Sequence, residues 1–201
     1  MEIVRLLITG NGPMLQNNPV SMRGRTSDEV ERGGKKIPLP YDEARSKLYA
    51  LPNGQLYAKS DWFREAALIA ASEVKDPSRK GRATMTRRFA ASVFLVSDAC
   101  PLFRNNGSKK KQPITAKDTD WEIDTRRVVV QKNGILRSRP KISDWACELQ
   151  FEYDSDLNEP HLIEAVMSHA GKFPGIGDYR VGKKGPFGRF TVKLLKNGKD
   201  E

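Results

Sequence analysis

The sequence predicts an α+β protein with a ferredoxin-like core, a βαββαβ palm that carries long loop and hairpin insertions. Two observations predict this fold. Segments with strand or helix periodicity follow one another in the order strand, helix, strand, strand, helix, strand. In addition, only 38% of the residues are hydrophobic and 30% are charged, which indicates one packed core with polar insertions. We expect a single domain over residues 1–201, with the insertions at about residues 10–58 and 98–143.

The first strand and the first long helix of the core are expected at residues 3–9 and at about residues 60–74. The strand is rich in leucine and β-branched residues, and a glycine-rich turn at residues 10–13 closes it. Between strand and helix the sequence is loop-like, except for a short helix expected at residues 41–49, directly after Pro40. The longer helix has apolar side chains at helical spacing, which predicts one face packed on a sheet: Phe63, Ala66, Ala67, Ala70 and Val74.

The middle of the chain is expected to contain a short strand, a mobile loop and a hairpin. Residues 91–96 form a short apolar run that is typical of a strand, and residues 98–119 have the polar, lysine-rich composition of a mobile loop. A further strand is expected at residues 121–131. The pair Asn133-Gly134 that follows it favours a hairpin turn.

The last three core elements are a strand, a helix and a strand. Residues 145–153 alternate strictly between two faces, one of them apolar, which predicts a half-buried strand. A helix is expected to begin at Pro160, because proline favours the first turn of a helix. It is expected to end at Gly171, because glycine is common at the C-terminal cap of a helix. Residues 187–195 then complete the core as its last strand.

The charge balance predicts a polyanionic partner. Lysine and arginine number 35 against 25 aspartate and glutamate, a formal net charge of +10, which attracts nucleic acid. The alternative is that this charge only keeps the protein soluble. The chain has no basic-then-apolar leader and no apolar run of the ~20 residues that span a bilayer, so we expect a cytoplasmic protein without a membrane partner. Cys100 and Cys147 lack the spacing of a zinc site or a disulfide framework and are expected to be reduced thiols.

The basic residues come in blocks, at residues 75–88, 126–141 and 180–189. Cations in loops at the rim of a sheet are well placed to follow a phosphate backbone, so we expect one continuous basic track across the sheet and its loops. A solvated face is the alternative for each block. The ten predicted phosphate contacts are Arg82, Arg87, Arg88, Arg126, Arg137, Arg139, Arg180, Lys183, Lys184 and Arg189.

A glycine-rich loop precedes the last strand, within residues 175–190. Glycine leaves the backbone without side-chain bulk, so the amide groups of such a loop can approach phosphates closely. The cations within the same stretch add formal charge at that place. The glycines of this predicted site are Gly175, Gly177, Gly182, Gly185 and Gly188.

Four aromatic side chains are immediate neighbours of cations in the sequence. An aromatic ring beside a guanidinium can stack an unpaired base while the cation takes the phosphate. The alternative is that the rings anchor the core. The four are Phe89, Phe103, Tyr179 and Phe187.

The G-x-G … G-x-x-G-R-F arrangement at residues 175–190 resembles the glycine-rich loop of the RAMP superfamily, the RNA-binding proteins of CRISPR effector complexes. The similarity is closest to their guide-RNA-binding backbone subunits, which place long insertions on an RNA-recognition-like palm. The chain also resembles a family of short tailed-phage proteins, at residues 12–15, 137–145 and 175–180. These resemblances imply sequence-tolerant binding of single-stranded RNA or DNA by a homo-oligomer or by one subunit of a larger nucleoprotein complex. They also imply a phage or prophage origin, with the protein in the cytoplasm of a bacterial host cell.

The sequence offers no convincing pattern of catalytic residues. It therefore predicts a protein that is not an enzyme and needs no cofactor. His161 and His169 are eight residues apart on the last helix, where capping or packing explains them. Two alternatives remain open: a protein that mimics a backbone subunit and inhibits a host CRISPR complex, and a metal-dependent nuclease. The nuclease alternative depends on acidic residues that could gather on one strand face and hold Mg²⁺: Asp118, Asp120, Glu122 and Asp124.

Overall fold

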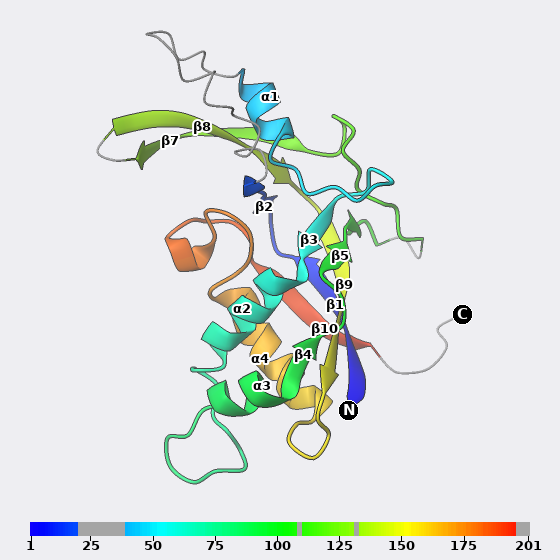
Figure 1. Cartoon of the computed structure of the whole chain (residues 1–201), viewed down its shortest axis with the longest axis vertical. Helices are drawn as coiled ribbons and strands as arrows, with labels where there is room; N and C mark the ends of the chain where they lie inside the picture. Colours follow the sequence, from blue (N-terminus) through cyan, green and yellow to red (C-terminus); the bar gives the residue numbers. More distant parts are fainter. Residues whose placement is uncertain (20–38, 108–109, 131–132, 196–201) are drawn as a thin grey trace.

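The computed structural model describes residues 1–19, 39–107, 110–130 and 133–195 of an α+β chain whose strands pair mostly antiparallel (Figure 1). Parts of the predicted loops at residues 10–57 and 98–119, and the last residue of the strand predicted at 121–131, therefore lie outside the described residues. Within the described part, no helix has the length and apolarity needed to cross a membrane.

The main sheet has the strand order β10-β1-β9-β4, and every neighbouring pair is antiparallel. Strand β1 buries alternate side chains, Val4, Leu6 and Ile8, as its apolar pattern requires. A short strand, β6, pairs with the other end of β9. The strands of this sheet are β1 (Glu2–Gly10), β4 (Val93–Leu95), β6 (Phe103–Arg104), β9 (Trp145–Tyr153) and β10 (Phe190–Leu195).

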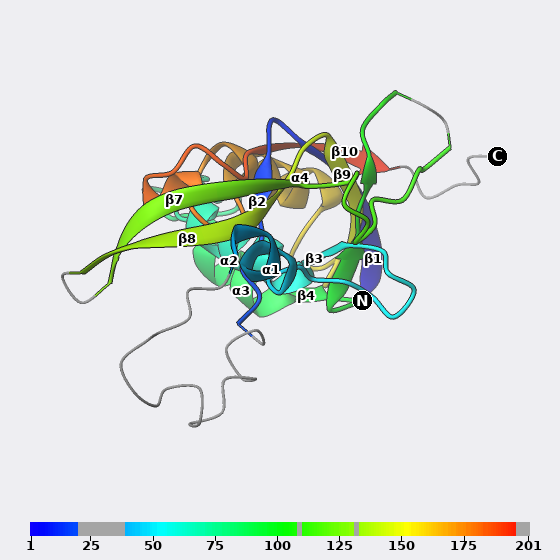
Figure 2. The same ribbon diagram turned by 90° about the horizontal axis from the view of Figure 1, so that it is seen from above.

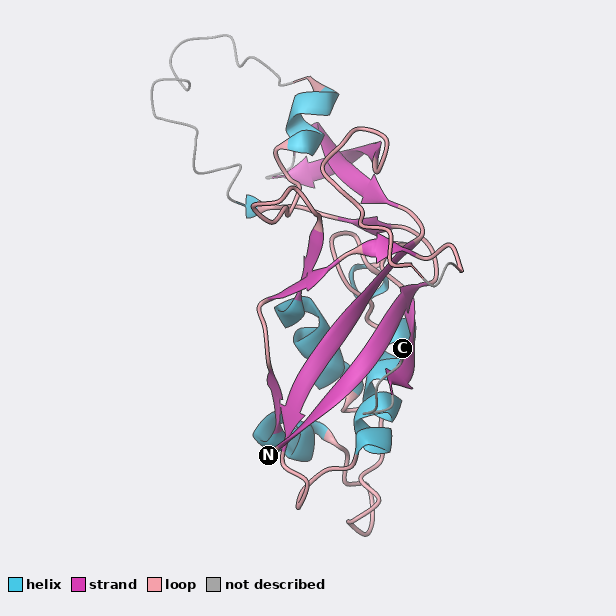
Figure 3. Ribbon diagram, turned by 90° about the vertical axis from the view of Figure 1, so that its right-hand side faces the viewer, coloured by secondary structure: helices cyan, strands magenta, loops and turns pink. Residues whose placement is uncertain are grey.

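Helices α2 (Ser60–Ala70) and α4 (Pro160–Lys172) cover one face of the main sheet (Figure 3). The buried stripe of α2 is mostly alanine, which lets the helix approach the sheet closely. Its one large buried ring, Phe63, meets Phe190 of β10 edge-on, with ring centroids 5.6 Å apart. This layer of helices on the sheet forms the core.

The segments between the core elements build a second, smaller layer at the top of Figure 1. A long hairpin of β7 and β8 pairs with β2, and helix α1 packs on it. Elsewhere β3 pairs with β5. The elements are β2 (Met14–Leu15), α1 (Pro40–Arg45), β3 (Tyr57–Lys59), β5 (Ala99–Pro101), β7 (Glu122–Val130) and β8 (Asn133–Ile142).

Several boundaries differ from the sequence prediction. Gly171, the expected C-terminal cap of its helix, lies inside α4, which ends at Lys172. The short helix ends at Arg45 rather than at residue 49, because Tyr49 is buried against Tyr57 and Trp62. Helix α2 ends at Ala70 rather than at residue 74. The last strand begins at Phe190, since residues 187–189 belong to the glycine-rich loop.

Three assignments in the middle of the chain were wrong. Residues 86–92 form a helix, α3 (Thr86–Ser92), which shortens the predicted strand at 91–96 to β4. The segment 98–119 is not a mobile loop throughout, because it contains β5 and β6 and buries Leu102 and Ile114. The predicted turn pair Asn133-Gly134 is the start of β8, where Asn133 pairs with Val130 and Gly134 with Val129.

Candidate nucleic-acid interface

The glycine-rich loop, residues 173–189, is tightly packed against the start of the chain. Gly188 has a φ of +75°, and a Cβ atom there would lie 1.8 Å from the carbonyl oxygen of Ile176. At Gly185 a Cβ atom would lie 1.8 Å from the carbonyl oxygen of Tyr179. No side chain fits at either position, so these glycines are needed for the shape of the loop.

The amide groups of this loop are largely used within the protein. Gly175 N donates to the Ala170 carbonyl at 2.9 Å, and Gly188 N donates to the Pro13 carbonyl at 3.0 Å. The amides of Gly182 and Gly185 likewise donate to carbonyls of the same loop. The predicted approach of these amides to phosphate is therefore corrected for Gly175, Gly182, Gly185 and Gly188, whose amides hold the loop in its fold.

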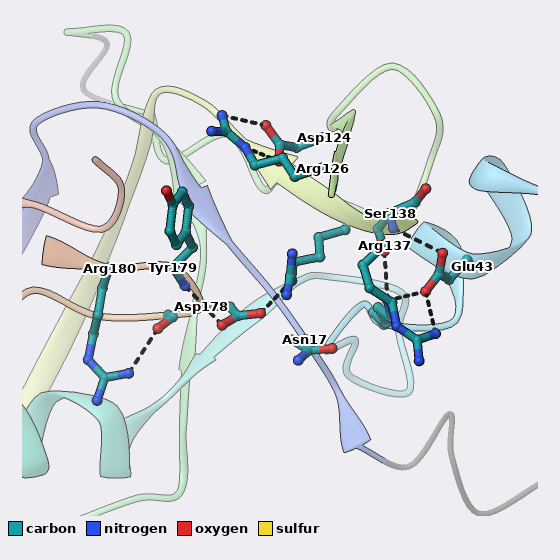
Figure 4. A network of polar contacts seen from close by, with 12 residues as sticks. Asn17, Glu43, Asp124, Arg126, Arg137, Ser138, Asp178, Tyr179 and Arg180 are labelled. Atoms are coloured by element: carbon teal, nitrogen blue, oxygen red, sulfur yellow. Dashed lines mark hydrogen bonds and ion pairs between the residues drawn. The ribbon is translucent and has the colours of Figure 1, made fainter. Parts of the chain in front are cut away.

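Arg126 on β7 joins the hairpin to this loop. Its guanidinium makes two hydrogen bonds to Asp124, at 2.7 and 3.0 Å, and lies 5.3 Å from the ring centre of Tyr179 and 5.0 Å from that of Phe187 (Figure 4). The hydrogen bond to Asp124 raises the pKa of Arg126. The charge is paired and the planar group is stacked, so this arginine has a structural role.

Arg139 on β8 makes a second connection to the same loop. Its Nε atom lies 2.5 Å from an Asp178 oxygen, and only 13% of its side chain is exposed. Asp178 is itself fixed to β2, because its amide donates to the Leu15 carbonyl at 2.9 Å. Figure 2 shows the hairpin running beside the loop that it contacts. The pair holds the hairpin to the rest of the protein.

Arg137 belongs to a buried ionic network under helix α1. Glu43 accepts hydrogen bonds from Lys47 at 2.7 Å, from the Ser138 amide at 2.9 Å and from Arg137 at 3.2 Å (Figure 4). Burial alone would raise the pKa of Glu43, but these three donors outweigh it and lower the pKa. Burial lowers the pKa of Lys47, and Glu43 opposes that shift.

Arg88 on α3 is also neutralised. It lies 3.0 Å from a carboxylate oxygen of Asp76, which is 2% exposed, and its Nε donates to the Leu157 carbonyl. Four of the ten predicted phosphate contacts are thus engaged by carboxylates. The corrected residues are Arg88, Arg126, Arg137 and Arg139.

The four acidic partners differ in how visible they are in the sequence. Asp124 precedes Arg126 by two residues on one strand, so the two side chains share a face and the pair could have been predicted. Glu43 and Asp178 come from segments distant in the sequence, and no local pattern shows them.

The other six predicted cations have no ion pair within the described part of the chain. They lie on two segments, called the basic loops below, on the left-hand side of the molecule in Figure 1. One is residues 75–88, a loop together with the first turn of α3, and the other is the glycine-rich loop. Lys183 and Lys184 are exposed on a short 3₁₀ turn, and the guanidinium of Arg180 donates to the Gly177 carbonyl at 3.2 Å. The six are Arg82, Arg87, Arg180, Lys183, Lys184 and Arg189.

The open face of the main sheet does not continue this basic surface. Arg5 of β1 pairs there with Glu148 of β9 at 3.3 Å, and Lys111 pairs with the same carboxylate at 2.5 Å. Glu152 of β9 is exposed beside them. The predicted continuous track across the sheet is therefore wrong, and the six unpaired predicted cations lie outside the sheet.

Among the four aromatic residues, Phe89 and Phe187 are buried in the packed interior, as the core alternative has it. Phe103 is partly covered, and Lys111 lies 5.5 Å from its ring centre. Tyr179 is 36% exposed with a φ of +47°. It is the ring best placed for stacking.

The four acidic residues of the nuclease alternative do not gather. Each has a different cationic partner: Arg45, Arg104, Lys141 and Arg126 for Asp118, Asp120, Glu122 and Asp124 respectively. His161 is exposed with Nδ1 3.2 Å from Glu159, and His169 is exposed in the last turn of α4. Among the described residues, no group of three or more histidine, cysteine or acidic side chains could hold a metal ion.

No protein-family model matches the chain, and no curated protein matches it in sequence. The resemblance to RAMP proteins and to tailed-phage proteins stays a prediction.

Proposed function

We propose that the protein binds single-stranded nucleic acid, RNA or DNA, through its backbone phosphates. One observation carries the proposal. The predicted cations that remain without an acidic partner lie on two loops on one side of the molecule, whereas those of the hairpin are neutralised. An unpaired surface cation is hydrated and can exchange that water for a phosphate oxygen at little cost. A cation already bound to a carboxylate has to break that pair first.

The expected salt dependence of the affinity follows from the number of available cations. Each phosphate neutralised on a single strand contributes about −0.7 to the slope of log affinity against log salt. Six contacts would therefore give a slope of roughly −4. Stacking of one base on Tyr179 would add about 1–3 kcal/mol, with little preference for sequence.

We further propose that the four core strands and helices α2 and α4 form a ferredoxin-like palm. Along the chain the core elements follow one another as β1, α2, β4, β9, α4 and β10, which is the order strand, helix, strand, strand, helix, strand. In the sheet these strands lie in the order β10-β1-β9-β4 with antiparallel neighbours, which supports the assignment. The palm would bind through its loops, because the open face of the sheet carries carboxylates where RNA-recognition modules carry stacking rings. Repeated copies along one strand would then form the predicted homo-oligomer.

The proposal is tested by fluorescence anisotropy with labelled single-stranded RNA, single-stranded DNA and duplex DNA of one sequence. We expect both single strands to bind, with affinity falling steeply between about 50 and 200 mM salt. Lys193→Ala is the matched control, because it removes one exposed cation from the last strand of the sheet and should leave binding unchanged. A salt response close to zero, or no binding, would contradict the proposal.

A further inference from the structure

A cavity of about 370 Å³ is lined by the segment between α2 and α3 and by the first turn of α3. Its lining combines four arginines with one carboxylate, so that its formal charge is 4 − 1 = +3. Two threonine hydroxyls complete the polar lining, and it contains no aromatic side chain. The lining residues are Asp76, Arg79, Arg82, Ala83, Thr84, Thr86, Arg87 and Arg88.

The walls of this arginine pocket are held by backbone pairing. Asp76 N donates to the Ala83 carbonyl and Met85 N donates to the Val74 carbonyl, both at 2.9 Å. Lys75 and Thr84 form an antiparallel bridge between these two hydrogen bonds. The segment 74–85 is therefore a closed loop, and the arginines on it start from a fixed backbone.

The single carboxylate of the pocket is already engaged. Asp76 accepts hydrogen bonds from the amide and the hydroxyl of Ser78, at 2.9 and 2.7 Å, and from Arg88 at 3.0 Å. Burial would raise the pKa of Asp76, but these donors outweigh it and lower the pKa, so the group stays ionised and holds Arg88 in place.

Three arginines remain for a ligand. Arg79 is 61% exposed and only approaches Asp76, at 3.8 Å, while Arg82 and Arg87 are exposed and make no ion pair with any described residue. Guanidinium groups bind phosphate oxygens with two parallel hydrogen bonds, which makes arginine better suited than lysine to a phosphate held in one place.

We propose that this arginine pocket binds a phosphate monoester, presented by the end of a bound strand. A monoester carries a charge of about −1.5 to −2 at pH 7, which suits a pocket lined by four arginines and one carboxylate better than the single charge of a backbone diester. A lining without aromatic side chains favours recognition of the phosphate over recognition of a base. The inference rests on the proposed function, because it assigns the end of the same strand to one of the two basic loops.

The test compares one single strand in three forms, with a 5′-phosphate, with a 3′-phosphate and with hydroxyls at both ends. We expect one phosphorylated form to bind roughly tenfold tighter than the hydroxyl form, the size expected of one charge-assisted hydrogen bond. Arg82→Ala with Arg87→Ala should abolish this difference. Both side chains are exposed, so the variant should fold, and its thermal unfolding is measured to establish that it does.

The matched control is Lys183→Ala with Lys184→Ala, which removes the same charge from the other loop. It should weaken all three strands alike and keep the preference for the phosphorylated end. Equal affinities for the three forms in the unmodified protein would overturn the inference and leave the proposed function intact.

The monoester could come from the end of a strand or from a free nucleotide. Binding of a nucleoside monophosphate to the protein is measured to distinguish these two sources. If no strand binds, the proposed function fails. The pocket chemistry would then stand only if the monophosphate binds the unmodified protein and not the Arg82→Ala, Arg87→Ala variant. Absence of that binding as well would overturn the inference.

Discussion

The β7–β8 hairpin and the two basic loops carry similar densities of positive charge but use it differently. On the hairpin, Arg126, Arg137 and Arg139 meet carboxylates and hold the hairpin to α1 and to the glycine-rich loop, whereas Arg127 is exposed and makes no ion pair with a described residue. On the loops, Arg82, Arg87 and the cations of residues 180–189 have no such partner in the described chain. A block of basic residues in a sequence is therefore a site for a polyanion only where the fold brings no carboxylate to it.

Low pH should have the largest effect on stability, because it protonates the carboxylates that pair with the cations. The pKa of Glu43 and Glu148 lies below the ordinary value of 4.5, and that of Asp76 and Asp120 below 3.8. For each, burial raises the pKa and hydrogen bonds outweigh it. A lowered pKa in the folded protein stabilises the fold at pH values above the ordinary pKa, and the stabilisation is lost as the pH falls through the folded value.

We therefore expect the free energy of unfolding in urea to be constant near neutral pH and to fall below about pH 4.5. The same denaturation series in high salt is the control, since buried pairs are screened less than exposed ones. Unfolding that does not change down to about pH 3 would show that these pairs contribute nothing.

Glu43→Gln on α1 should lower the free energy of unfolding more than any other single substitution among the residues that pair with the hairpin. It leaves the Lys47 ammonium, whose side chain is 8% exposed, without its countercharge, and should lower the free energy of unfolding by about 3 kcal/mol. Asp118→Asn is the matched control next to α1, because the Arg45–Asp118 pair is 3.7 Å apart and more than half exposed on both sides. That change should cost less than about 0.5 kcal/mol. Similar losses for the two variants would contradict the structural role of the buried network.

Gly188→Ala tests whether the glycine-rich loop is as rigid as its packing indicates. A Cβ atom 1.8 Å from the Ile176 carbonyl oxygen, at a φ of +75°, should cost about 3 kcal/mol of unfolding free energy. Gly81 shares the positive φ, at +85°, but has nothing within 4 Å of its Cβ position. Gly81→Ala should therefore cost about 1 kcal/mol. If the two thermal unfolding midpoints shift equally, packing of the loop is not what requires Gly188.

Arg126→Ala should have a smaller effect than Glu43→Gln or Gly188→Ala. The residue stacks beside Tyr179 and Phe187 but is partly exposed, so its loss should lower the free energy of unfolding by about 1 kcal/mol. Arg126→Lys keeps the charge and loses the planar stack, and should behave like the alanine variant. Full stability of the lysine variant would show that charge alone holds the contact.

The sequence predicted the parts of this molecule that depend on local pattern. The strict alternation at residues 145–153 matches the bounds of β9, and the stripe of Phe63 and the alanines matches the buried face of α2. Helix α3 was missed because its charged and small residues show no apolar stripe before Phe89. Its place is set by Phe89, which is buried against Phe151 of β9.

The candidate site was predicted only in part, for a related reason. Whether a cation is unpaired depends on carboxylates from segments that are distant in the sequence. Asp178 pairs in this way with Arg139, and Glu43 pairs with Arg137. Asp76 is nearer in sequence to Arg88, but a closed loop and a helix turn lie between them. Pairing of this kind is a property of the fold, and periodicity does not contain it.

The most direct measurement of the central claim is the salt dependence of single-strand affinity in two charge-matched variants. Lys183→Ala with Lys184→Ala removes two unpaired loop cations, and Arg126→Ala with Lys141→Ala removes two hairpin cations that are paired with Asp124 and Glu122. The loop variant should reduce the magnitude of the log–log slope by about 1.4, the contribution of two phosphate contacts, while the hairpin variant keeps the slope of the unmodified protein. Equal reductions in the two variants, or a reduction in the hairpin variant alone, would contradict the account.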